Sequence, residues 1–291
     1  MTEHTIIVAA PAGPGRQRLT ELLRRKGATV RSLERERLVP QGQLVIEDTR
    51  VLLGGEDLLL GATAAVILEP GTMWPLPALD PTAEQWAAHR GRFDDWLRDE
   101  RESASLWFSL LAIIDELVPT VVNPQVAQAH LALKPDALAL LREAGVAVAP
   151  TLVTNDPEAV ARFCADHPDD ALLALPLWPG AAPRRLARED LAALPLDQEP
   201  LLLQALPGAE QLDVTAVAGR ALDGTLPPRA EASVRAVHEH LELTLGLVTF
   251  RGAAENLLLS DLGLPDLGAI DEHRARQVVD ALWDHLEAAC P

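Results

Sequence analysis

The N-terminal part of the chain alternates between short apolar runs and one amphipathic stretch, and this alternation restricts the fold more than any other feature. Residues 5–10 form a continuous apolar run rich in β-branched side chains, which is typical of a buried strand. A turn rich in proline and glycine follows, and residues 17–25 have helical spacing that ends at Gly27. Residues 28–33 return as a strand. We therefore expect an α/β fold class.

The same alternation continues along the chain. Residues 43–68 indicate a β-hairpin followed by a buried strand, and residues 83–117 carry apolar side chains at helical spacing. Asp156, Pro157 and Glu158 have the pattern of a helix N-terminus, with a capping aspartate and an early proline. Further strands are expected near residues 119–123, 146–154, 171–177, 201–204 and 212–217, helices over 134–144, 157–167, 229–245 and 271–289, and a hairpin over 248–259.

Charge and cysteine content exclude several classes of function. The formal net charge of −18 argues against non-specific binding to nucleic acid or to anionic membranes, because both require a basic face. Cys164 and Cys290 are far apart and form no C-x-x-C motif, so neither a disulfide framework nor a zinc site is indicated. No run reaches the roughly 18 apolar residues of a membrane span, and residues 1–10 do not resemble a secretion signal. A cytoplasmic protein is expected.

General catalytic motifs do not identify a site. Gly13, Pro14 and Gly15 follow the first predicted strand, but they lack the third glycine of a dinucleotide fingerprint and the Gly-Lys-Ser/Thr of a phosphate-binding loop. His238 and His240 lie two residues apart on a predicted helix, where their side chains point in different directions. A shared metal ion is therefore not expected at these histidines.

Residues 93–163 carry a more specific pattern. An acidic helix is followed by a strand ending in Asn-Pro, a Lys-Pro helix start, a Gly-Val strand with Pro-Thr, and an Asn-Asp-Pro helix cap. The matching residues are Asn123-Pro124, Lys134-Pro135, Gly145-Val146, Pro150-Thr151 and Asn155-Asp156-Pro157. This run resembles the ATP-grasp ligases, specifically the branch of the graspetide (microviridin-type) synthetases and the ribosomal-protein glutamate ligases. The hairpin before it, with Trp74, resembles the pre-ATP-grasp domain of that branch.

The resemblance implies an ATP-grasp fold with an N-terminal pre-ATP-grasp α/β domain. The expected parts are a pre-ATP-grasp-like domain over 1–118, a central ATP-grasp subdomain over 119–200 and a C-terminal subdomain over 201–291. It also implies ATP and Mg²⁺ as cofactors, in a reaction that phosphorylates a carboxylate before an amine or hydroxyl attacks it. Such chemistry requires cations, because charge builds up on the transferring phosphoryl group.

Several of the implied phosphate contacts are changed. Lys134 matches the first family lysine, which contacts nucleotide phosphate, although an ordinary solvated lysine at a helix start is an equal alternative. The second family lysine is absent from the run Leu175-Pro176-Leu177. The family arginine falls on Asp213, which reverses the charge at a position that should stabilise an anion.

The remaining candidates for nucleotide binding are Gln204 and two arginines. Gln204 matches the first residue of the family's Gln-Glu pair, but its neighbour is Ala205. Arg184 and Arg185 lie where the family places its phosphate-covering loop, so they are candidate replacements for the lost cations, as is Arg251. An arginine replaces a point charge more easily than it replaces a metal ion.

The implied metal site is also depleted. After the Leu-Gly-Leu strand the family has an aspartate, whereas residues 249–251 contain no acid. In the following hairpin the family's Glu-x-Asn falls on either Ser260 or Asp261 for the glutamate, and on Leu262 or Gly263 for the asparagine. Asp261 is thus the one candidate metal ligand, with a turn-capping aspartate as the alternative.

Three functions remain open at this stage. The first is a degenerate ATP-grasp protein, or pseudoenzyme, that binds a peptide or a partner enzyme in a pathway modifying ribosomally made peptides. The second is an active ATP-dependent ligase forming amides or esters, with relocated phosphate and metal ligands. The third is a nucleotide-binding assembly subunit without turnover. No catalytic residue is assigned, the substitutions argue against ATP and Mg²⁺ binding, and the resemblance also suggests a homodimer.

Overall fold

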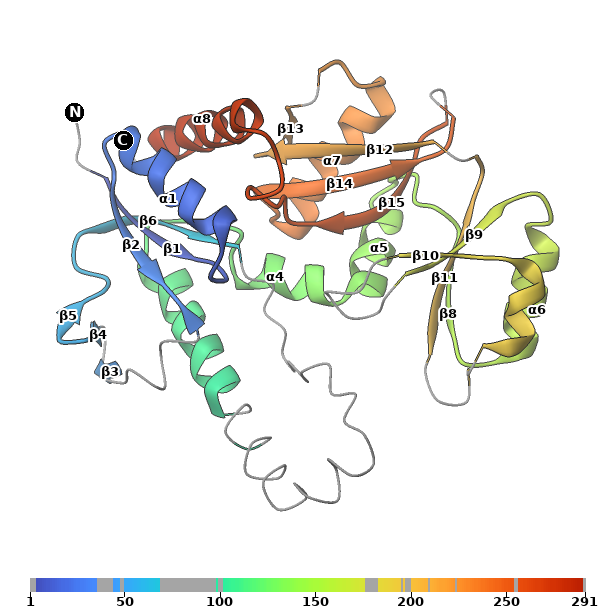
Figure 1. Ribbon diagram of the computed structural model, residues 1–291, viewed down its shortest axis with the longest axis horizontal. Coiled ribbons are helices and arrows are strands. Elements are labelled where there is room, and N and C mark those ends of the chain that lie inside the picture. Colours follow the sequence, from blue (N-terminus) through green and yellow to red (C-terminus); the bar gives the residue numbers. More distant parts are fainter. Residues whose placement is uncertain are drawn as a thin grey trace. The chain divides into compact units, whose positions relative to one another are not determined.

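The computed structural model describes residues 4–35, 44–47, 50–68, 98, 102–175, 183–194, 196, 200–208, 210–222, 224–253 and 256–289. The chain divides into two compact units, one formed by Met1–Gln125 with Leu286–Pro291 and the other by Val126–His285. Helices and strands alternate along the chain, and the strands form several sheets, so the expected α/β fold class is confirmed (Figure 1). The division expected from the sequence, into 1–118, 119–200 and 201–291, stays a prediction.

A parallel sheet forms the centre of the first unit. Its strand order is β2-β1-β6-β7, and every neighbouring pair is parallel. The strands are β1 (Thr5–Ala9), β2 (Thr29–Leu33), β6 (Ala62–Ile67) and β7 (Thr120–Val122), and α1 (Pro14–Arg25) connects the first two. The side chains of Trp107, Leu110 and Ile114, on a helix over 102–117, pack with Ile7 and Ile67 in its core. These helix residues therefore belong to the core, as their spacing predicted.

A small antiparallel sheet confirms the expected hairpin in this unit. It consists of β3 (Leu44–Glu47), β4 (Arg50–Leu53) and β5 (Glu56–Asp57). Gly54 and Gly55 have φ angles of 61° and 85°, in the left-handed region that glycine adopts without strain. This turn therefore requires the Gly-Gly pair seen in the sequence.

The second unit contains a first antiparallel sheet with the order β10-β9-β11-β8. Its strands are β8 (Thr151–Thr154), β9 (Ala171–Leu175), β10 (Arg184–Leu186) and β11 (Leu201–Leu206). The helix α6 (Pro157–Asp166) covers one face, where Val160 packs with Leu172 and Leu203. The predicted strand over 171–177 is seen as far as Leu175, and Pro176 and Leu177 lie outside the described residues.

A second antiparallel sheet in the same unit has the order β13-β12-β14-β15. Its strands are β12 (Gln211–Val217), β13 (Arg220–Ala221), β14 (Leu245–Arg251) and β15 (Leu258–Gly263). The helices of this part are α4 (Gln125–Ala132), α5 (Lys134–Glu143) and α7 (Pro228–Leu241), and most of α8 (Glu272–Ala289) also belongs to this unit. One face of the sheet, carrying Val214, Val248 and Phe250, packs against apolar side chains of α4, α5 and α7. The opposite face is free of this core and carries the candidate site.

The helix expected over 229–245 is shorter than the sequence predicted. It ends at Leu241, and Glu242 follows in the left-handed conformation with φ of 53°. Leu245 instead begins β14, in which Gly246, Val248 and Phe250 are buried at every second position. Leucines stand at every second position over 241–247, which is the period of a strand, so the pattern itself favours the boundary that the structure shows.

The start of α6 is capped by Asp156, as the sequence predicted. The Asp156 carboxylate accepts a hydrogen bond of 2.8 Å from the backbone N–H of Glu158, and Pro157 occupies the first turn. Asp156→Ala is expected to lower the free energy of unfolding by about 1 kcal/mol, because one backbone donor loses its partner. Urea unfolding measures the change. Asp166→Ala, at the opposite end of the same helix, is the control and should not destabilise the protein, since a negative charge is unfavourable there.

His285 on α8 makes the stability of the protein depend on pH. Burial lowers the pKa of His285 from its ordinary value of 6.5, and the nearby His238 lowers it further. The unfolded chain therefore binds a proton more readily than the folded chain, so the free energy of unfolding decreases as the pH falls through 6.5. His285→Gln is expected to weaken this dependence in thermal unfolding between about pH 7.5 and 5. The same change at the exposed His273 should leave it intact, and an unaltered profile in His285→Gln would remove His285 as the cause.

The helices of the described part do not include one with the length and apolar character needed to cross a bilayer.

Candidate functional site

The face of the second sheet that points away from the core is shaped by an irregularity in β15. Thr249 pairs with Asp261 and Phe250 pairs with Leu259, so Ser260 is an extra residue between two ladder positions. Leu259 and Leu262 both lie in the core. Ser260 and Asp261, which stand between them, therefore both belong to the opposite face.

This bulge bears on the alternative left open by the sequence. A regular strand would place only one of Ser260 and Asp261 on the site face, because successive side chains alternate. The extra residue brings both to it. Which of them corresponds to the family glutamate stays open, yet both are available to the same site.

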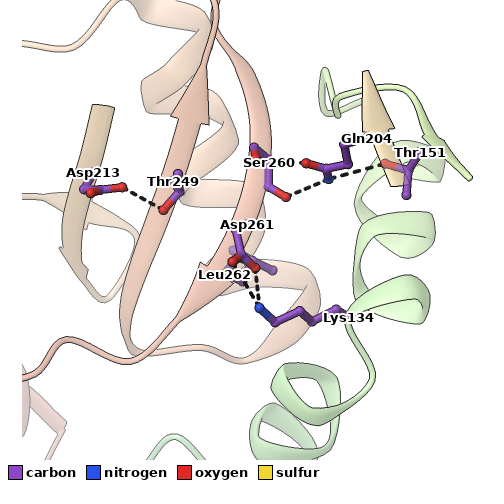
Figure 2. A network of polar contacts seen from close by, with 8 residues as sticks. All are labelled: Lys134, Thr151, Gln204, Asp213, Thr249, Ser260, Asp261 and Leu262. Carbon is purple, nitrogen blue, oxygen red and sulfur yellow. Dashed lines mark hydrogen bonds and ion pairs between the residues drawn. The ribbon is translucent and has the colours of Figure 1, made fainter. Parts of the chain in front are cut away.

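Lys134 and Asp261 form an ion pair at the β15 edge of this sheet (Figure 2). The ammonium group of Lys134 lies 2.8 Å from one carboxylate oxygen of Asp261 and 3.0 Å from the other. The backbone N–H of Leu262 donates a further bond of 2.8 Å to this carboxylate. The two side chains are only 14% and 19% exposed. The sequence assigned Lys134 to phosphate and Asp261 to metal, and the structure brings these two candidates together as partners.

The position of Lys134 follows from the start of α5. Lys134 is the first residue of the helix, and Pro135 occupies the first turn, where its missing N–H leaves no bond unmade. The N-cap residue Leu133 offers no side-chain acceptor to the first turn. A helix N-terminus carries partial positive charge, which Lys134 increases. The first turn of α5 therefore favours an anion beside it, and the anion beside Lys134 is Asp261.

Gln204 and Ser260 form a second, neutral pair that is fully buried (Figure 2). The amide nitrogen of Gln204 donates to the backbone oxygen of Ser260 at 2.8 Å, and the Ser260 hydroxyl donates to the amide oxygen of Gln204 at 3.0 Å. The same amide nitrogen is 3.4 Å from the hydroxyl of Thr151. Both amide hydrogens of Gln204 thus have partners within the protein.

These contacts lie where the two sheets of the second unit meet. The backbone N–H of Ala149 donates to Leu259 at 2.9 Å, and the N–H of Leu259 donates to Ala147 at 2.8 Å. Gln204 belongs to β11 of the first sheet and Ser260 to β15 of the second. The amide–hydroxyl pair therefore joins the sheets beside a short stretch of shared backbone bonding.

Asp213 and Thr249 extend the polar face across β12 and β14. They are neighbours in the ladder, and the Thr249 hydroxyl donates to the Asp213 carboxylate at 2.8 Å. The amide of Gln211 donates to both oxygens of the same carboxylate, at 3.0 and 2.9 Å. Because Thr249 also pairs with Asp261, three polar residues form a row across β12, β14 and β15. Asp213 is held by neutral donors.

Two of the three predicted arginines lie apart from this network. Arg184 and Arg185 are exposed on β10, at the edge of the first sheet. Within the described ranges neither makes an ion pair or hydrogen bond with Lys134 or Asp261. Arg251 lies opposite Gln211 at the end of β14, and its buried Nε has no hydrogen-bond partner in the described part of the chain.

Two contributors were not recognised as site residues from the sequence. Thr151 was noted only as part of the Pro-Thr motif, and Thr249 only as a position without an acid. Thr151 contacts Gln204, and Thr249 donates a hydrogen bond to Asp213, so each belongs to the site through a residue on a neighbouring strand. Among the described residues, no group of three or more Asp, Glu, His or Cys side chains could hold a metal ion.

No family model matches the sequence. No curated protein matches it either. Solved structures do match, and those described next cover nearly the whole chain at low sequence identity.

Three of the matching structures are ligases or macrocyclases in complexes. ATP-grasp ligase PsnB, with a phosphomimetic variant of a minimal precursor, Mg and ADP, has a TM-score of 0.79 and 22% identity over 99% of both chains. Macrocyclase MdnC from Microcystis aeruginosa, bound with precursor peptide MdnA, has a TM-score of 0.70 and 15% identity, covering 96% of this chain and 99% of that one. A RiPP-associated ATP-grasp ligase from Chryseobacterium gregarium, with ADP and a leader and core peptide, has a TM-score of 0.65 and 13% identity over 98% and 97% of the two chains.

Proposed function

Because this chain has the ATP-grasp fold, as the resemblance of residues 93–163 predicted, we propose that it is a degenerate member that binds without ligating. Its ligand would be a peptide, or a partner enzyme, in a pathway that modifies ribosomally made peptides. PsnB, MdnC and the Chryseobacterium gregarium ligase have each been solved with a precursor, leader or core peptide. The extent of the structural match supports peptide binding, and the geometry of the site argues against ligation.

The ion pair between Lys134 and Asp261 is the main observation in favour of binding without ligation. Phosphoryl transfer needs a cation facing the transferring group and carboxylates facing a metal. Here the candidate cation and the candidate metal ligand neutralise each other, with oxygen–nitrogen distances of 2.8 and 3.0 Å. While this ion pair is intact, neither side chain is available to a phosphate group or to a metal ion.

The donor set of the polar face does not fit Mg²⁺. This ion requires nearly octahedral oxygen coordination, usually from one or two carboxylates together with phosphates and water. The carboxylate of Asp261 is bound by Lys134 and by the N–H of Leu262, and that of Asp213 by Thr249 and Gln211. A metal ion would have to displace donors from both. We therefore derive no catalytic step through a bound metal.

The charge at Asp213 supports the same conclusion. A phosphoryl group needs positive charge or hydrogen-bond donors where its negative charge develops. Asp213 presents an exposed carboxylate at the position where the resemblance implies an arginine. Its repulsion of phosphate adds to the loss of cationic contacts.

The experiment that tests this function separates turnover from binding. The purified protein is incubated with ATP, with Mg²⁺ or Mn²⁺, and with a synthetic precursor peptide of the graspetide class, while ADP release and loss of water from the peptide are measured. We expect neither product. Fluorescence anisotropy of the labelled peptide should show binding without nucleotide.

Each half of the proposal has its own contradicting result. ADP release that disappears in Lys134→Met would show an active ligase. Absence of peptide binding, with no ADP formed, would contradict a peptide as the ligand and would leave only the partner enzyme.

One observation favours the active ligase as the second candidate. Arg184 and Arg185 are exposed and have no ion pair among the described residues, so their charges are available to a phosphate group. If these residues replace the lost cations, the double change Arg184→Ala and Arg185→Ala would abolish both nucleotide binding and ADP release.

A further inference from the structure

The arrangement at the start of α5 suggests that the protein supplies its own anion to Lys134. Two features there favour negative charge: the partial positive charge of the helix N-terminus, and the lysine on its first residue. The group in contact with the lysine is the carboxylate of Asp261, which is 127 residues distant in sequence. We infer that Asp261 is an internal competitor that excludes phosphate-bearing anions from Lys134.

The geometry of the pair supports this competition. Both oxygens of Asp261 lie within 3.0 Å of the ammonium group, and the N–H of Leu262 fixes the carboxylate from its own strand. Asp261 pairs with Thr249 on the site face beside the bulge at Ser260, whereas a regular strand would place Ser260 and Asp261 on opposite faces. The carboxylate is thus already oriented before any anion arrives.

The tethering of Asp261 gives it an advantage over an anion from solution. A group held in place by the fold acts at a high effective concentration, and no translational freedom is lost when it binds. The pair is also largely shielded from water, with side-chain exposures of 14% and 19%, so salt in the solvent screens it only weakly. A free phosphate group must therefore displace a preorganised partner.

This inference goes beyond the proposed function, since it predicts a binding activity that the unchanged protein lacks. Asp261→Asn keeps the shape of the side chain and removes its charge. Lys134 is then left partly buried without a counter-ion, which makes an anion from solution the favoured partner. The inference is also independent of peptide binding, because its probe is an inorganic anion.

The experiment titrates tripolyphosphate, in the presence of EDTA, into four proteins: the unchanged chain, Asp261→Asn, the double variant Lys134→Met with Asp261→Asn, and Asp136→Asn. Calorimetry gives the affinity, and thermal unfolding gives the stabilisation. Asp261→Asn should bind at least about tenfold more tightly than the unchanged chain, and the double variant should lose this gain. Asp136→Asn is the matched control, because Asp136 lies in the first turn of the same helix and pairs with His130 rather than with Lys134.

Three results would overturn the inference. The unchanged chain could bind tripolyphosphate as tightly as Asp261→Asn, the gain could persist in the double variant, or Asp136→Asn could show an equal gain. If Asp261→Asn does not fold, Asp261→Ser provides the same loss of charge with a residue suited to a bulged strand. Failure here leaves the assays of ADP release and peptide binding unaffected, so the two proposals are judged separately.

Discussion

Phe250→Ala lowers the free energy of unfolding by about 3–5 kcal/mol, the largest effect we expect from a single change in the second unit. Phe250 is fully buried on β14, a central strand of its sheet, and packs among side chains from α4, α5 and α7. Its removal loses apolar contacts and leaves a cavity that the surrounding strands cannot close. Urea unfolding of the purified variant measures the loss.

Thr249→Ala is the control for this change, because Thr249 is the neighbouring residue on the opposite face of the same strand. It loses one hydrogen bond, to Asp213, and should cost only about 0.5–1.5 kcal/mol. Equal effects of the two substitutions would contradict the register of β14 and the assignment of its core face.

Gln204→Ala is expected to cost about 2–4 kcal/mol, since it combines a cavity with the loss of buried hydrogen bonds. The change removes the acceptor of the Ser260 hydroxyl and the donor to the Ser260 backbone oxygen, in a place where both residues have no exposed surface. Water cannot readily replace the lost partners there. The two sheets of the second unit would also lose the side-chain bridge between them.

A double-mutant cycle with Ser260→Ala isolates the contribution of this bridge. The two single changes each leave a buried polar group without its partner, whereas the double variant removes both groups. We therefore expect the double variant to be more stable than the sum of the single effects by about 1–2 kcal/mol. Strict additivity would show that Gln204 and Ser260 do not depend on each other.

The fold was largely predictable because its local signals agree. The alternation of strand and helix in residues 5–33 and the cap at Asp156 were each read correctly from short segments. The exception is the helix end near Leu241, where the prediction continued the helix to residue 245 although leucines at every second position already follow the strand period. Glu242, rather than a glycine, takes the left-handed conformation after this helix, so the usual signal for a helix end was missing.

The site was predictable only as separate residues. The sequence named Lys134 and Asp261 for different ligands, but their contact depends on the packing of α5 against the second sheet and on one extra residue in β15. A bulge of one residue reverses which side chains share a face, and the sequence pattern does not record it. Gln204 stays a candidate for nucleotide binding, but its contact with Ser260 could not be predicted, because Ser260 lies on another sheet.

Calorimetric titration of ATP, with and without excess Mg²⁺, tests the central claim most directly. Because Lys134 and Asp261 are paired with each other, we expect no detectable binding of ATP up to about 1 mM, with or without the metal. Binding in the micromolar range that requires Mg²⁺ would contradict this account, because it would mean that the ion pair opens and that Asp261 acts as a metal ligand.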